Sequence, residues 1–285
     1  MLGAIIGDTV GSVYEFNNIK TTHFPLFGPQ SNYTDYSIMT MAVAKWLLTD
    51  PQHGMDTLET IFLDFAKKYP CPMGGYGGGF SRWLFHPDKL SDYEGDMAYE
   101  TGQRHPYNSF GNGAAMRCSA NGWMFDTLGE TERVAGLSAA ITHSHPEGIK
   151  GAQSTAAAIF MARNGKSKEE IRDYISAKYG YNLNRTCDEI RPNYDWDSSC
   201  QGTVPEAMVA FFDSTDFESA IRLAVSLGGD SDTLTCITGG IAEAFYKKIP
   251  NGMALKIWGL IPEDFKDILK EMEQRSEYRL PNILK

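Results

Sequence analysis

Apolar side chains in this chain recur mainly at three- and four-residue steps, and segments that alternate polar with apolar residues are scarce. Leu234, Ile237, Ile241 and Phe245 show the spacing, which places them on one face of a helix. Segments that each bury one such face pack helix against helix. The sequence therefore predicts an all-α fold, with a single compact helical domain over residues 1–285.

Helices are predicted over residues 38–48, 55–69, 130–142, 148–163, 166–178, 205–212, 216–226 and 233–246, and over part of 262–280. Gly3, Gly7 and Gly11 stand at four-residue spacing, which lets another backbone approach one face of the first segment. The irregular segment 179–202 combines aromatic and Asp residues and is a candidate for the mouth of a substrate site.

Composition narrows the functional classes. The chain has 285 residues, 42% of them hydrophobic and 22% charged, and no apolar run reaches the roughly 18 residues that span a membrane. A net charge of −10 argues against binding to a nucleic-acid backbone, which requires clustered cations. The five cysteines are scattered, and residues 1–6 lack a secretory pattern, so reduced thiols and a cytoplasmic location are expected.

The segment from Leu227 to Thr233 places two glycines and two carboxylates before an apolar helix. On a regular helix Asp230 and Asp232 would diverge by about 200°, whereas in a turn both point the same way. The glycines permit such a turn, and oxygen ligands there suit magnesium or manganese. Capping of the helix by Asp230, Ser231 or Asp232 is the commoner use of such residues, and both interpretations remain open.

A second helix start repeats this pattern. Thr34, Asp35 and Ser37 precede or open an apolar helix, and capping is again the default interpretation. Glu15 follows Asp8 by seven residues, which predicts a position on the same helical face among apolar neighbours. A carboxylate in apolar surroundings needs a partner, so Glu15 is either in a buried salt bridge or in a metal or catalytic site.

The middle of the chain carries weaker signals. Residues 70–82 contain five glycines, which suits a phosphate-contacting loop, a lid or a plain flexible loop. The small residues of 111–116 permit close approach of a helix or a ligand, and Arg117 could meet a phosphate or a buried carboxylate. His143 and His145 flank a turn at Pro146; zinc binding by them is disfavoured, and a structural or ligand-contacting role is expected.

Together these motifs resemble the ADP-ribosylglycohydrolase family. The resemblance rests on five segments that span nearly the whole chain: Gly7-Asp8 with Glu15, Thr34-Asp35, Gly111 to Arg117, Thr142 to Glu147, and Gly228 to Thr233. It implies an all-α domain with a central metal-lined cleft that holds two magnesium or manganese ions. It also implies cleavage of the bond between ADP-ribose and a modified side chain, notably arginine, or of a related ADP-ribosyl compound.

The resemblance assigns metal binding to Glu15, Thr34, Asp35, Asp230, Asp232 and Thr233. It assigns catalysis to Glu15, Asp35, Asp230 and Asp232. It assigns substrate binding to Tyr76, Gly77, Gly111, Asn112, Gly113 and His143, and the partner is ADP-ribose or an ADP-ribosylated protein or small molecule.

Two acidic helix starts that converge would repel each other without a cation, and metals suit a reaction that passes through an oxocarbenium-like state. Glu15 would either bind a metal ion or act as the general base that takes a proton from the attacking water.

One position departs from the family pattern. The first metal motif of the family usually has two consecutive acidic residues, and here the second is Tyr36. A phenol is a poor and bulky substitute for a carboxylate toward a hard cation, so one of the two ions is expected to be weakened or lost. Three hypotheses follow: an active metal-dependent hydrolase, an impaired member that binds ADP-ribose or an ADP-ribosylated partner, or a structural protein whose acidic motifs are helix caps.

Overall fold

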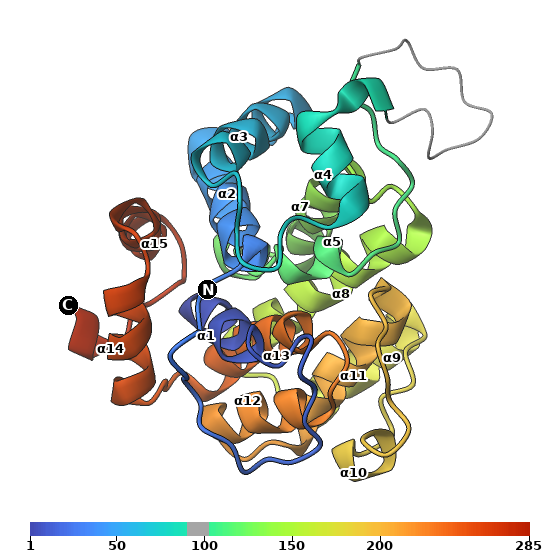
Figure 1. Ribbon diagram of the computed structural model, residues 1–285, viewed down its shortest axis with the longest axis vertical. Helices are drawn as coiled ribbons and strands as arrows, with labels where there is room; N and C mark the ends of the chain where they lie inside the picture. Colours follow the sequence, from blue (N-terminus) through green and yellow to red (C-terminus); the bar gives the residue numbers. More distant parts are fainter. Residues whose placement is uncertain (90–102) are drawn as a thin grey trace.

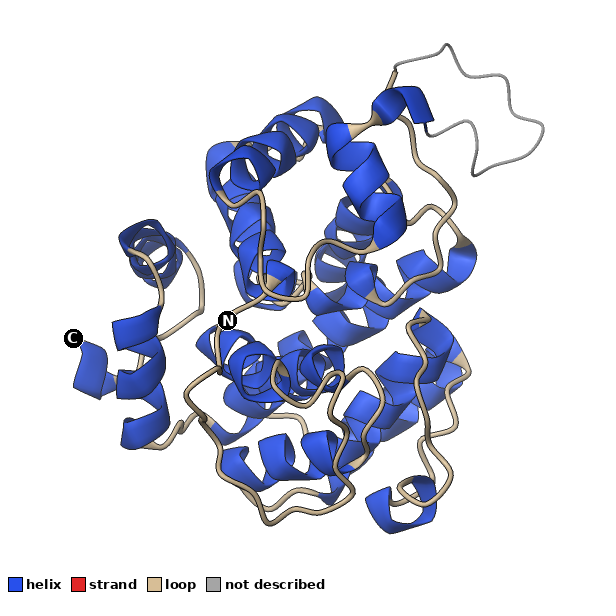
Figure 2. Cartoon of the chain, in the orientation of Figure 1, coloured by secondary structure: helices blue, strands red, loops and turns tan. Residues whose placement is uncertain are grey.

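The computed structural model describes residues 1–89 and 103–285, which form helices joined by turns and loops (Figures 1 and 2). Within these ranges only two isolated backbone bridges occur, Thr34 with Met73 and Gly111 with Ser199, and there is no β-sheet. The predicted all-α fold is confirmed. No helix in this part of the chain is both long and apolar enough to cross a membrane.

The helices are, in chain order, α1 (Leu2–Gly11), α2 (Asp35–Thr49), α3 (Met55–Lys68), α4 (Gly78–Phe85), η1 (Pro87–Lys89), α5 (Gly113–Met116), α6 (Asn121–Met124), α7 (Leu128–Ala140), α8 (Pro146–Arg163), α9 (Lys168–Tyr179), α10 (Cys187–Ile190), α11 (Cys200–Asp213), α12 (Phe217–Ser226), α13 (Ser231–Tyr246), α14 (Asn251–Leu260), α15 (Glu263–Arg275) and η3 (Asn282–Leu284). Helix α13 packs against α1, α8, α11 and α12 near the middle of the molecule (Figure 1). Helices α2, α3, α4 and α7 lie on one side of this centre, and α14 and α15 flank it. The start of α13 therefore lies where the parts of the fold meet.

The closest helix pair is α1 against α13, and glycine makes it possible. A Cβ atom on Gly7 would lie 1.9 Å from the carbonyl oxygen of Thr235, and one on Gly3 would lie 2.4 Å from that of Gly239. The predicted close approach along this glycine face is confirmed. Every residue of α1 is buried, so this helix is held on all sides. The chain leaves α1 beside the first turn of α13, since a Cβ on Gly11 would lie 2.4 Å from the Cα of Asp232.

Most predicted helices are present, with informative differences at their bounds. Helix α11 begins at Cys200, upstream of the predicted start at residue 205, and Pro205 lies inside it. Helix α4 begins within the glycine-rich segment, because its Phe80, Trp83 and Leu84 are buried in the core and outweigh the poor helix propensity of glycine. Helix α14 carries no strong pattern and was not predicted.

The expectation that Asp8 and Glu15 share a helical face is wrong. Helix α1 ends at Gly11, where the amide of Ser12 makes the last helical bond to the carbonyl of Asp8. Glu15 lies in the turn that follows and is half-buried. Asp8 remains inside the helix and is fully buried. The two carboxylates thus belong to different local structures, one to a helix and one to a turn, and they contact different residues.

Candidate functional site

A cleft with a volume of about 1250 Å³ opens above the start of α13. Its lining comes from segments far apart in sequence: the turn after α1, the start of α2, the glycine-rich segment, residues 106–113, His143, the loop before α11, and Asp230. Most of the predicted site residues are therefore brought together. Gly77 lines this cleft, whereas the hydroxyl of Tyr76 donates to the carbonyl of Tyr69 at 2.7 Å and the residue is not part of the lining.

An acidic cluster forms one end of the cleft. Carboxylate oxygens of Glu15, Asp230 and Asp232 lie within 4.8 Å of one another. Asp230 and Asp232 come from the first turn of α13, and Glu15 comes from the turn after α1. Gly228 and Gly229 have φ angles of 75° and 69°, which is the left-handed conformation that the predicted turn requires. The turn thus aims two carboxylates of the same segment at a third.

Asn18 joins the two turns that carry this cluster. Its side-chain oxygen accepts a hydrogen bond from the amide of Gly229, and its side-chain nitrogen donates to the carbonyls of Gly229 and Glu15 at 2.9 and 2.8 Å. Sequence analysis missed this residue, because an asparagine in a loop gives no sign of a partner more than two hundred positions away. Asn18 therefore sets the position of Glu15 relative to Asp230.

The structure bears on the capping interpretation at the start of α13. Asp230 occupies the N-cap position but its side chain makes no capping hydrogen bond. One carboxylate oxygen instead accepts from the Tyr36 hydroxyl at 3.3 Å, and the other accepts from the Asn112 amide at 2.8 Å. Both donors face the cleft. Asp230 therefore does not cap α13, and its carboxylate is instead held by two donors that line the cleft.

The start of α2 is built differently. The Thr34 hydroxyl accepts from the Tyr36 amide at 3.2 Å and so caps the helix, as the default interpretation predicts. Asp8 accepts hydrogen bonds from the amides and hydroxyls of both Thr34 and Ser37. The Thr34 hydroxyl donates to Asp8 and accepts from an amide, which leaves it one lone pair. Asp35 lies in the same cleft, 4% exposed, but outside the trio within 4.8 Å.

The electrostatics of the cluster call for a positive partner. Burial, reinforced by Asp230 and Asp8, raises the pKa of Glu15 to about 7. Burial and neighbouring carboxylates also raise the pKa values of Asp35 and Asp232 well above their ordinary range. Like charges in a poorly solvated site disfavour ionisation, and a divalent cation reverses that effect.

The donor set fits a hard divalent cation. All candidate ligands are oxygens, and the buried hydroxyl of Thr233 has no hydrogen-bond partner within the described ranges. Tyr36 does not add a charge, because burial and the nearby carboxylates raise its pKa well above 10, which keeps the phenol protonated. Its hydroxyl points to Asp230 as a donor.

The other end of the cleft is formed by the segment around Asn112. The backbone amide of Asn112 donates to the carbonyl of Ser198 at 2.8 Å, and its side chain reaches Asp230, so the residue connects both ends. His143 packs against this loop: a Cβ on Gly113 would lie 3.1 Å from its Nε2. Burial and then Arg117 lower the pKa of His143 well below its ordinary value, so the ring is neutral.

Arg117 is buried and lies over the rings of Phe62 and Phe80 at 4.8 and 5.6 Å. Its guanidinium donates to the Ser138 carbonyl and the Thr142 hydroxyl, at 2.8 and 2.9 Å. Of the two predicted partners, no carboxylate accepts from it within the described ranges. Arg117 lines the cleft, so contact with a phosphate stays a prediction.

Comparison with known proteins identifies the family. The family model for ADP-ribosylglycohydrolase matches residues 1–278. The chain belongs to the ADP-ribosylglycohydrolase family. A solved structure described as an ADP-ribosylglycohydrolase-related protein complex has a TM-score of 0.70, is 21% identical and covers 96% of each chain, which shows the same fold.

Several relatives of this chain are distant in sequence. ADP-ribosylhydrolase ARH3 of Mus musculus is 26% identical over 86% of this chain and 82% of its own length. ADP-ribosylarginine hydrolase Tri1 of Pseudomonas putida is 22% identical over 86% of this chain and 69% of its own length. The family consists of ADP-ribosyl hydrolases that are typically metal-dependent, and the acidic trio in this member could bind a metal.

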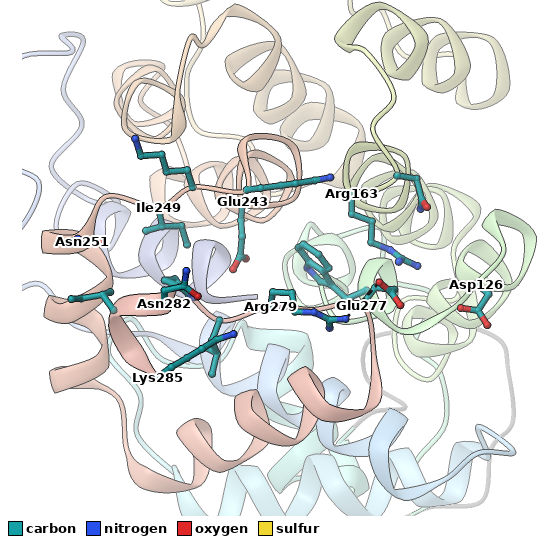
Figure 3. Close-up of a pocket in the computed structure, with 16 residues that line it drawn as sticks. Asp126, Arg163, Glu243, Ile249, Asn251, Glu277, Arg279, Asn282 and Lys285 are labelled. Atoms are coloured by element: carbon teal, nitrogen blue, oxygen red, sulfur yellow. Dashed lines mark ion pairs between the residues drawn. The ribbon is translucent and has the colours of Figure 1, made fainter.

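A second pocket of about 1030 Å³ lies between the ends of α8 and α13 and the C-terminal segment (Figure 3). None of the predicted site residues lines it. Two cations of this pocket have protein partners: Arg163 donates to the carbonyls of Gly122 and Phe125, and Lys285 forms an ion pair with Glu273 at 2.9 Å. Cations at the C-terminal ends of helices also offset the helix dipole. The acidic cleft is therefore the candidate site of this family member.

Proposed function

We propose that this chain is a metal-dependent hydrolase that cleaves the glycosidic bond between ADP-ribose and a modified side chain, with arginine as the foremost candidate, or a related ADP-ribosyl compound. The observation that carries the proposal is the orientation of Asp230. It stands at a helix start without capping it, it lines the cleft as Glu15 does, and its carboxylate lies within 4.8 Å of those of Glu15 and Asp232. A structural protein whose acidic motifs were caps would give Asp230 a capping bond.

The residues divide into two groups along the cleft. Glu15, Asp230 and Asp232, with Asp35 and the hydroxyls of Thr34 and Thr233 near them, would hold magnesium or manganese at the acidic end. Gly77, Gly111, Asn112, Gly113 and His143 line the remainder of the cleft and would hold the ADP-ribose. The absence of side chains at the glycines leaves room for a diphosphate to approach the backbone.

When bound, the metal would hold ribose hydroxyls and lower the pKa of water. In the reaction the oxygen of water bonds to the anomeric carbon, the bond to the side-chain nitrogen breaks, and a proton passes to that nitrogen. Glu15 is the candidate base, since it is the half-buried carboxylate of the trio and lies at the cleft wall. Asn112 keeps Asp230 oriented by its 2.8 Å hydrogen bond.

A second candidate function is favoured by Tyr36. Its hydroxyl contacts Asp230 as a neutral donor where an additional carboxylate would supply a ligand. In this alternative one ion is weak or lost, and the chain binds ADP-ribose or an ADP-ribosylated partner without efficient turnover.

One experiment separates the two functions. Release of ADP-ribose from an ADP-ribosylated arginine peptide is measured with added Mg²⁺ or Mn²⁺ for the unaltered chain and for Tyr36→Asp. Turnover by the unaltered chain, abolished by EDTA, supports the hydrolase. A silent unaltered chain and an active Tyr36→Asp variant would support the binding function. Asp230→Asn is the control for both, because it removes a carboxylate from the trio and keeps the side-chain volume.

A further inference from the structure

Two large aromatic side chains are stacked in solvent at the edge of the cleft. Phe16 is 75% exposed and Trp196 is 46% exposed. Their ring centroids are 5.5 Å apart with an interplanar angle of 16°. Trp196 is part of the cleft lining and Phe16 stacks on it outside the hydrophobic core; the pair is called here the aromatic platform. Exposed apolar groups gathered at a site are typical of binding surfaces.

The platform lies next to the acidic cluster. Phe16 directly follows Glu15, and the turn that carries both is tied to Gly229 by Asn18. Trp196 belongs to the loop before α11, in which Tyr194 packs against Gly229: a Cβ on this glycine would lie 2.7 Å from the Tyr194 ring. Both halves of the platform are therefore positioned by the turn that precedes Asp230.

The loop before α11 is also tied to the other end of the cleft. The carbonyl of Ser198 accepts from the amide of Asn112 at 2.8 Å, and the amide of Cys200 donates to the carbonyl of Phe110 at 2.8 Å. These bonds flank the bridge between Gly111 and Ser199. The side chain of Trp196 is thus presented from a loop that is fixed at both of its sides, which reduces the entropy lost when a ligand contacts it.

The charges near the platform are mainly negative. Asp195 and Asp197 flank Trp196 in sequence, and Glu15 precedes Phe16. The nearby cation, Lys20, donates to the carbonyls of Tyr194 and Leu227 at 2.6 and 2.5 Å. Asp197 accepts from the amide of Ser199 at 2.7 Å and Asp195 from the amide of Trp196 at 2.8 Å, so the exposed ring face of the indole is what attracts a flat cation.

The geometry points to a leaving-group subsite. We infer that Phe16 and Trp196 bind the guanidinium of an arginine that carries ADP-ribose. This inference rests on the proposed function, in which the ribose lies at the acidic cluster. A guanidinium is planar, charged and able to stack, whereas the neutral oxygen of a serine linkage offers none of these properties. The platform selects arginine-linked over serine-linked substrates.

The test compares two peptides of one sequence, ADP-ribosylated at arginine or at serine, with the full chain in Mn²⁺. Trp196→Ala is expected to lower kcat/KM for the arginine-linked peptide about tenfold, the size of one cation–π contact. The serine-linked peptide is expected to change less than twofold. Trp196→Phe is expected to restore most of the loss, because it returns an aromatic face. Phe16→Ala is expected to act in the same direction with a smaller effect.

Phe85→Ala is the matched control, since Phe85 is an exposed aromatic residue, 39% accessible, outside the cleft lining. Equal losses for both peptides, or no loss for the arginine-linked one, would overturn the inference. If the unaltered chain cleaves neither peptide, the proposed hydrolysis fails and the inference is judged by calorimetric binding of the intact arginine-linked peptide. Weaker binding by Trp196→Ala then supports the subsite, and unchanged binding overturns it.

Discussion

The starts of α2 and α13 share a pattern of hydroxyl and carboxylate residues before a buried helix, yet these residues have different hydrogen-bond partners at the two starts. At α2, Thr34 caps the helix and Asp8 collects hydrogen bonds from Thr34 and Ser37. At α13, Asp230 occupies the cap position without capping, and its oxygens face donors in the cleft. Asp8 thus secures the start of α2, whereas Asp230 faces the cleft at the start of α13.

The difference comes from what lies beside each start. Helix α1 brings a buried carboxylate, Asp8, to the start of α2, where amides and hydroxyls offset part of its burial cost, although burial still raises the pKa of Asp8 to about 6. At α13 the neighbour is the turn with Glu15, which brings another acid within 4.8 Å. A local sequence pattern therefore does not distinguish a cap from a ligand site, because the distinction depends on the partner supplied by α1.

The largest effect is expected for Gly7→Ala, which disturbs both helix starts. A Cβ here would lie 1.9 Å from a backbone oxygen of α13, so α1 and α13 must separate. We expect a loss of about 3 kcal/mol or more in the free energy of unfolding, measured by urea denaturation. Gly259→Ala in α14 meets nothing within 4 Å and is expected to stabilise by about 0.5–1 kcal/mol. Equal effects of the two would contradict the close packing of α1.

Asp8→Ala comes next and removes hydrogen bonds on the α2 side. It leaves buried amides and hydroxyls of Thr34 and Ser37 without their acceptor. We expect a loss of about 3 kcal/mol in the free energy of unfolding in EDTA. Asp50→Ala removes acceptors for two amides at the far, less buried end of α2 and should cost about 1 kcal/mol. A loss at Asp8 no greater than at Asp50 would show that Asp8 does not secure this start.

Asp230→Asn tests the α13 side, where metal binding and not stability should change. We expect Mn²⁺ affinity to fall roughly 100-fold, or about 2.7 kcal/mol, by calorimetry, while unfolding in EDTA changes by less than about 1 kcal/mol. Asp216→Asn is the control for loss of a capping aspartate, because the Asp216 side chain caps α12 by accepting from the amide of Ser219. It should leave Mn²⁺ affinity intact. A stability loss in EDTA typical of a lost cap would count against the assigned role of Asp230.

The smallest effect is expected for Thr233→Val, which removes the buried hydroxyl without a hydrogen-bond partner. In EDTA the variant should be as stable as the unaltered chain or slightly more stable, by up to about 1 kcal/mol, because no bond is lost. With Mn²⁺ the thermal stabilisation by the metal should shrink, as a ligand is missing. Thermal unfolding with and without Mn²⁺ measures both; identical metal stabilisation would remove Thr233 from the ligand set.

Much of the helical fold could be predicted from local patterns. The apolar spacing in α2, α3, α8 and α13 is sufficient, because a buried helix face repeats within a few residues. Helix α14 could not be predicted in this way, since its Met253, Ala254 and Ile257 are buried by contacts with distant segments. The glycine face of α1 was also readable, because only a close neighbour explains it.

The sequence by itself determined the acidic and glycine-rich segments that form the site and the turn before Asp230, since residue type sets what a backbone and a side chain can do locally. Only the tertiary structure decided that Glu15 leaves the α1 helix, that Asn18 ties it to Gly229, and that Asp8 serves α2. The physical reason is distance along the chain. Hydrogen bonds and repulsions between residues 8, 15, 36 and 230 exist only after the helices pack, and they decide which carboxylates are used for stability and which are left for a ligand.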